Sequence, residues 1–156
     1  MDIQTEVGNY LRERARLVDA IRREGLAGTP AVEIARGVPT AAFSRDQVKE
    51  FIACVLLADT AAKAFAQAGL AGVLTARESG IDAPRHVTAT LTVDPQQLRD
   101  RPEVARQARD ALRDYLLTLE LPLGQPDPGP GEREDLIDRL LLDGAAVRLV
   151  KLKPRT

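Results

Sequence analysis

Apolar residues recur along the first third of the chain at the spacing of α-helices. Over residues 9–24 they fall every three or four positions, and Gly25 supplies a stop signal. A second helix start is predicted at Thr29 and Pro30, because threonine caps helices and proline suits the first helical position. That helix is short, since Gly37 ends it.

A third and longer helix is predicted to begin after Ser44. Gln47, three residues later, completes a capping box, in which each side chain bonds to the other residue's backbone N–H. No glycine or proline interrupts residues 45–68, and Gly69 ends the helix. Its expected buried face consists of Val48, Phe51, Ile52, Val55, Leu56, Ala62 and Phe65. Together the three helices predict a tri-helical N-terminal core.

The period of the pattern changes after residue 82. Residues 87–93 alternate apolar and polar side chains, which predicts a half-buried strand, and residues 146–152 predict a second one. A single strand leaves backbone groups unsatisfied, so the two are expected to pair within the chain or across a dimer. Residues 71–79 fit either a short helix or an extended segment.

Helices are expected between the two strands. The pattern predicts one over residues 102–119, a proline- and glycine-rich loop over 122–131, and another helix over 132–143. The fold class is therefore predicted to be α+β and mainly α. A helical part over residues 1–82 precedes a β-α-α-β part with a small two-stranded sheet over residues 83–156.

Composition adds expectations about oligomeric state and source. Only 3% of the 156 residues are aromatic and none is tryptophan, so the core rests on smaller side chains and oligomerisation is expected to bury additional surface. The formal net charge of −1 argues against coating of nucleic acid through bulk charge, but leaves a local basic patch open. Four of the 22 basic residues are lysine and the rest arginine, as is typical of GC-rich bacterial genomes.

Few side chains with catalytic or metal-binding chemistry are present. His86 is the single histidine and falls on the polar side of a predicted strand, whereas Cys54, the single cysteine, falls on a buried helix face. One cysteine excludes an intramolecular disulfide and a multi-cysteine metal site. No glycine-rich phosphate loop and no apolar run of about 18 residues occurs. We therefore expect a cytoplasmic, non-enzymatic protein without a cofactor, a metal or a membrane span.

The segments "VEIARGV" and "FSRDQVKEFI" resemble the helix-turn-helix pattern of bacterial DNA-binding proteins. The resemblance covers about residues 9–60. The matching positions are Ile34, Ala35, Ser44, Val48 and Ile52. In that family the second helix of the motif lies in the major groove of DNA, and its N-terminal residues meet the edges of the bases.

The resemblance implies a set of DNA-binding residues in this chain. Arg45 and Gln47 would face bases, since arginine pairs with guanine and glutamine with adenine. Ser44 and Lys49 would contact bases or phosphates. Thr29, beside the start of the shorter helix, would donate a hydrogen bond to a phosphate.

Two features depart from the family pattern. Residues 37–43 form a longer link than the usual three- or four-residue turn. Asp46 and Glu50 place negative charge beside the basic residues. Both departures bear on whether the third helix can dock in a groove of DNA.

The sequence therefore supports two hypotheses about function. The first is a small transcriptional regulator that binds double-stranded DNA as a homodimer, because two half-sites supply the contacts that one short helix lacks. The alternative is a non-enzymatic adaptor or accessory subunit whose long, alanine-rich helix over residues 44–68 packs on a partner protein.

Overall fold

The structure is a computed structural model that describes four stretches of the chain: residues 2–83, 87–118, 138 and 147–150. In chain order the elements are α1 (Ile3–Leu26), α2 (Ala31–Gly37), α3 (Arg45–Gln67), β1 (Leu74–Glu78), β2 (Thr88–Val93), α4 (Pro95–Leu98), α5 (Pro102–Thr118) and β3 (Val147–Val150). The predicted loop over 122–131, the predicted helix over 132–143 apart from Asp138, and His86 lie outside these stretches.

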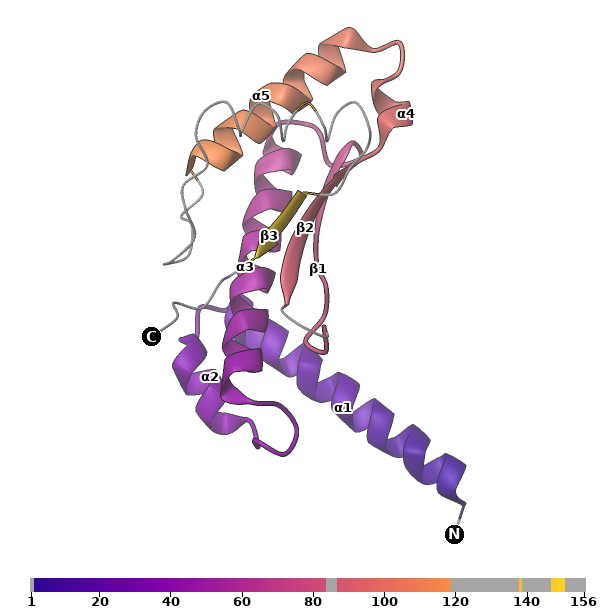
Figure 1. Cartoon of the computed structure of the whole chain (residues 1–156), viewed down its shortest axis with the longest axis vertical. Coiled ribbons are helices and arrows are strands. Elements are labelled where there is room, and N and C mark those ends of the chain that lie inside the picture. Colours follow the sequence, from indigo (N-terminus) through magenta and orange to yellow (C-terminus); the bar gives the residue numbers. More distant parts are fainter. Residues whose placement is uncertain (1, 84–86, 119–137, 139–146, 151–156) are drawn as a thin grey trace.

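Helix α3 runs through the centre of the molecule, with the sheet along one side of it (Figure 1). Helices α1 and α2 pack near the start of α3, and α5 packs near its end. Five side chains of α3 are completely buried: Val48, Phe51, Cys54, Ala61 and Phe65. The hydrophobic core is thus built around α3, and the capping box at Ser44 marks the start of this helix.

The sheet has three antiparallel strands in the order β1-β2-β3. In β2 the apolar side chains Ala89, Leu91 and Val93 are buried and alternate with the half-buried Thr90 and Thr92. The α+β, mainly α class is confirmed, and so is the pairing of the two predicted strands as β2 and β3. Strand β1 is an additional strand, which arises from the segment left open between helix and extended structure.

Helix α1 is longer than predicted at both ends. It begins at Ile3, because the Gln4 backbone N–H donates to the Asp2 carboxylate at 3.0 Å and caps the helix. The predicted start at residue 9 was therefore wrong. Gly25, predicted to end the helix, lies buried in its last turn, and the chain instead turns at Gly28, whose φ is 95°.

Two further details of the core differ from expectation. Leu56 and Ala62 were expected on the buried face of α3, but both are exposed, Leu56 to 42%. The division of the chain into two parts at residue 82 remains a prediction. One cluster of buried residues, from Ile21 to Leu112, includes residues on both sides of that boundary. The two proposed parts therefore share a core.

Candidate functional site

The start of α3 carries four of the five side chains that the helix-turn-helix resemblance assigns to DNA. Two of these side chains, Ser44 and Gln47, form hydrogen bonds within the start of the helix itself. The Gln47 backbone N–H donates to Ser44 Oγ at 3.1 Å, and the Ser44 backbone N–H donates to Gln47 Oε1 at 3.0 Å. The predicted capping box is confirmed, and a base contact by Gln47 would require this bond to break.

The two basic side chains at this helix start remain accessible. Arg45 is exposed and Lys49, one turn later, is half-buried. Neither forms a hydrogen bond or ion pair with another residue in the part of the chain that the structure describes. Asp46 and Glu50 lie beside them, so two positive and two negative charges share the first two turns.

Thr29 does not cap α2 as predicted. The N-cap residue is Pro30, which has no side-chain donor or acceptor, and α2 begins at Ala31. The Thr29 hydroxyl instead donates to Glu24 Oε2 at 2.8 Å. The nearby Glu24 carboxylate opposes the approach of a phosphate to Thr29.

The link between α2 and α3 is long, as predicted, but it is well anchored. Its ends are fixed by the buried side chains of Val38 and Phe43. Between them the backbone N–H groups of Ala42 and Phe43 donate to the Pro39 carbonyl at 2.9 and 3.3 Å. This turn packs α2 against a core helix, and it is not the short turn of the helix-turn-helix family.

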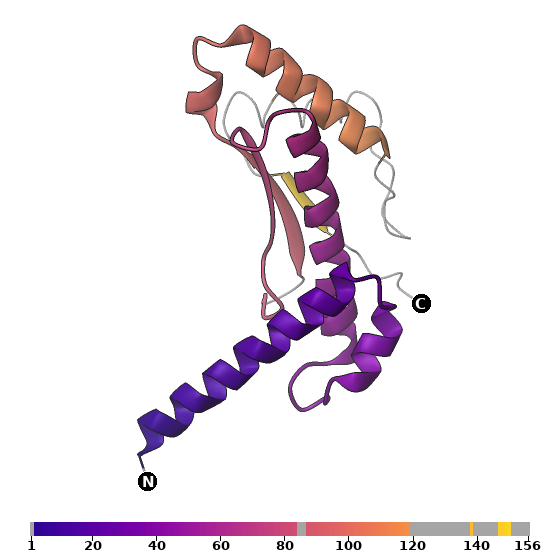
Figure 2. The same cartoon turned by 180° about the vertical axis from the view of Figure 1, so that it is seen from behind.

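A second candidate surface, which the sequence analysis did not identify, lies on α1. The first half of this 24-residue helix extends away from the rest of the molecule (Figures 1 and 2). Four large apolar side chains are exposed on it: Ile3 to 75%, Val7 to 49%, Tyr10 to 62% and Leu11 to 57%. Their three- and four-residue spacing places them on one side of the helix, which we call the α1 apolar face.

The second half of α1 is held by two ion pairs to the sheet region. Arg22 Nη2 lies 2.8 Å from Glu78 of β1. Arg14 donates two hydrogen bonds to Asp82, each 2.6 Å long, and its guanidinium lies 4.6 Å from the centre of the Phe43 ring. These contacts fix the direction in which the free half of α1 extends.

The Arg14–Asp82 ion pair also shifts the pKa values of both side chains. Hydrogen bonding from Arg14 holds the pKa of Asp82 below its ordinary value of 3.8, and the same bonds raise the pKa of Arg14. Because the folded-state pKa of Asp82 lies below its unfolded value, the pair stabilises the fold above that unfolded value. The contribution is lost as the pH falls through the folded-state pKa.

We therefore predict a pH-dependent effect of Asp82→Asn. At neutral pH the substitution should lower the free energy of unfolding by about 0.5–1 kcal/mol, the upper range for accessible ion pairs, since the Asp82 side chain is 56% exposed. At a pH below the folded-state pKa of Asp82 the variant and the parent should become equally stable. Urea unfolding of both proteins at the two pH values measures this, and a difference that persists in acid would contradict it.

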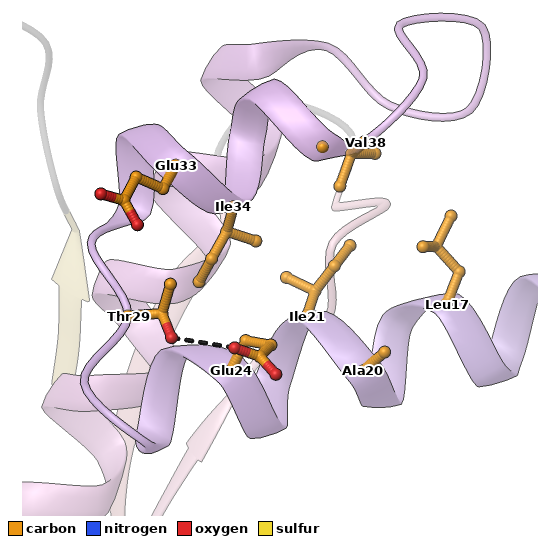
Figure 3. Close-up of a pocket in the computed structure, with 9 residues that line it drawn as sticks. Leu17, Ala20, Ile21, Glu24, Thr29, Glu33, Ile34 and Val38 are labelled. Carbon is orange, nitrogen blue, oxygen red and sulfur yellow. Dashed lines mark hydrogen bonds between the residues drawn. The ribbon is translucent and has the colours of Figure 1, made fainter.

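A groove separates the second half of α1 from α2 (Figure 3). Its volume is about 360 Å³. Apolar side chains from both helices point into it, and two carboxylates lie toward the end where α1 joins α2. The residues that line this α1–α2 groove are Leu17, Ala20, Ile21, Glu24, Thr29, Glu33, Ile34, Gly37 and Val38.

The thiol of Cys54, the single cysteine of the chain, is buried. Cys54 is completely inaccessible, and its thiol donates to the Val87 carbonyl at 3.2 Å. Within the described stretches, no three histidine, cysteine or carboxylate side chains lie close enough together to hold a metal ion.

The helices within the described ranges include none with both the length and the apolar composition of a membrane span. No family model, curated protein or solved structure matches the chain.

Proposed function

We propose that this chain is a non-enzymatic protein-interaction module that binds a helix of a partner protein along α1. The observation that carries the proposal is the α1 apolar face, four large side chains exposed on a helix that extends from the body. Isolated exposed apolar residues are common, but a contiguous row on one helix face is typical of a docking surface.

The burial of α3 favours α1 over α3 as the helix that docks on a partner protein. Eight residues of α3 are buried against the rest of the fold. A helix so enclosed offers little free surface to a partner, which disfavours the original assignment of docking to residues 44–68. Helix α1 supplies the unoccupied face instead, and its second half continues into the α1–α2 groove.

DNA binding is retained as a second candidate because Arg45 and Lys49 are accessible and without described partners. Their four-residue spacing places both on the solvent side of α3, where they could contact phosphates. The bonds within the capping box and the carboxylates of Asp46 and Glu50 weigh against this candidate.

A neutral helical peptide tests the proposed function. The peptide carries leucine at helical spacing and glutamine at the flanking positions, and calorimetric titration measures its binding to the full chain. The double variant Val7→Ser/Tyr10→Ser should weaken binding by at least about tenfold, since each buried apolar side chain contributes about 1.5–3 kcal/mol. Leu56→Ser, at an exposed position of α3, is the matched control and should bind as the parent does.

Mixing the same protein preparations with random double-stranded DNA distinguishes docking by α1 from DNA binding by the start of α3. Under the docking proposal the parent protein does not bind DNA at low or moderate salt. Salt-sensitive DNA binding that Arg45→Ala/Lys49→Ala abolishes, together with no peptide binding, would reject docking and place the function at the start of α3.

A further inference from the structure

We infer that the partner of α1 is a basic amphipathic helix that lies along the α1 apolar face and enters the α1–α2 groove. This inference rests on the docking function proposed above and adds the chemistry of the partner. Three features carry it: the alignment of the apolar face with the groove, the distribution of charge around them, and the poor fit of a second copy of the same chain.

The apolar face and the groove lie along the same side of α1, and Arg14, which binds Asp82, lies between them. Leu17 lines the groove, and Tyr10 and Ile3 precede it by seven and fourteen residues. Seven residues make almost two helical turns, so the three side chains follow one line along α1. The exposed apolar part of this line, residues 3–11, is about 13 Å long.

Acidic side chains border this surface on one flank. Glu6 and Glu13 lie seven residues apart, beside the apolar line, and both are exposed. Glu24, eleven residues or about three turns further on, and Glu33 of α2 line the groove itself. Glu13 also lies 3.3 Å from Arg16, and Glu24 accepts a hydrogen bond from the Thr29 hydroxyl.

Three basic residues of α1 lie on the other side of the helix. Arg12, Arg16 and Arg23 are separated by four and seven residues, so they share a face, and all three are exposed. Helical geometry places that face roughly opposite the apolar line. Arg14 lies on the apolar side but is paired with Asp82. A partner approaching the apolar surface therefore meets an excess of carboxylates over unpaired guanidinium groups, which favours lysine or arginine at its flanking positions.

A second copy of this chain fits the surface poorly. In an antiparallel pair of α1 helices like flanks face each other, so Glu6 and Glu13 of the two copies would repel. In a parallel pair the bodies of the two copies would lie at the same end of the paired helices, where they would crowd each other. Charge and shape together favour a different, basic helix.

Three peptides of about 22 residues, with one leucine stripe and lysine, glutamine or glutamate at the flanks, test the inference. Titrated into the full chain at low salt, the lysine peptide should bind at least about tenfold more tightly than the glutamate peptide. The difference should shrink at moderate salt because the carboxylates are exposed. Glu13→Gln/Glu33→Gln should reduce this preference, whereas Glu103→Gln on α5 should leave it unchanged.

The alternative outcomes separate this inference from the proposed function. Equal binding of all three peptides would overturn the basic partner while docking by the α1 apolar face stands. Self-association measured by light scattering, removed by Tyr10→Ser, would make a second copy the occupant and overturn the basic helix. Absence of both peptide binding and self-association would reject the docking function as well.

Discussion

Replacing Phe51 with alanine is expected to lower the free energy of unfolding by about 3–5 kcal/mol. The Phe51 side chain is completely buried within α3, and the guanidinium of Arg22 lies 5.5 Å from the centre of its ring. Alanine would leave a cavity at the place where α1 crosses the core, and the surrounding helices can close it only in part. Such a loss is a large fraction of the roughly 5–15 kcal/mol that stabilises a typical domain.

Urea unfolding followed by circular dichroism measures the effect, with Leu56→Ala as the matched control. Leu56 lies on the same helix, five residues after Phe51, and is 42% exposed. Its replacement should change the free energy of unfolding by less than about 1 kcal/mol. Equal losses in the two variants would contradict the burial pattern of α3, including the exposure of a residue that periodicity assigns to the core.

The features predicted correctly from the sequence depend on neighbouring residues. The capping box of Ser44 and Gln47 involves residues three positions apart, so its pattern is visible in the sequence and its geometry follows. The alternation in β2 is equally local. The class of the fold followed from such elements, because their type and order restrict how layers can pack.

The features that were missed depend on contacts between distant residues. Thr29 has the side chain of a cap, but Glu24 of the preceding helix takes its hydroxyl hydrogen bond. Strand β1 is short and mostly polar, and its assignment required the partner strand β2. A local pattern cannot reveal which of two satisfactory hydrogen-bonding arrangements the folded chain will contain.

The candidate docking surface was missed for a different reason. Its signal was present, since Asp2 is a good cap and Ile3, Val7 and Tyr10 continue the helical period, with Gly8 as the interruption. Recognising the helix would still have left its exposure open. An apolar stripe predicts that a face will be covered, but only the structure shows that residues 3–11 extend past the body.

The direction of that extension depends on Gly25, and Gly25→Val is the second substitution with a large expected effect. A Cβ atom at this position would lie 3.1 Å from Cγ2 and 3.5 Å from Cγ1 of Ile52. Alanine should therefore change stability little, since the gain in helix propensity of about 0.5–1 kcal/mol is offset by the shift that Ile52 must make. Valine adds two methyl groups at the same contact and should lower the free energy of unfolding by about 1–3 kcal/mol.

Gly8 provides the matched control in the same helix, because no heavy atom lies within 4 Å of the Cβ position there. Gly8→Val should change the free energy of unfolding by no more than about 0.5 kcal/mol. Adding Ile52→Ala to Gly25→Val should recover at least about 1 kcal/mol relative to the sum of the single losses, because the new methyl groups then fill the vacated space. Additive losses would mean that α1 does not approach α3 at Gly25. The position of the α1–α2 groove, which depends on that approach, would then be wrong as well.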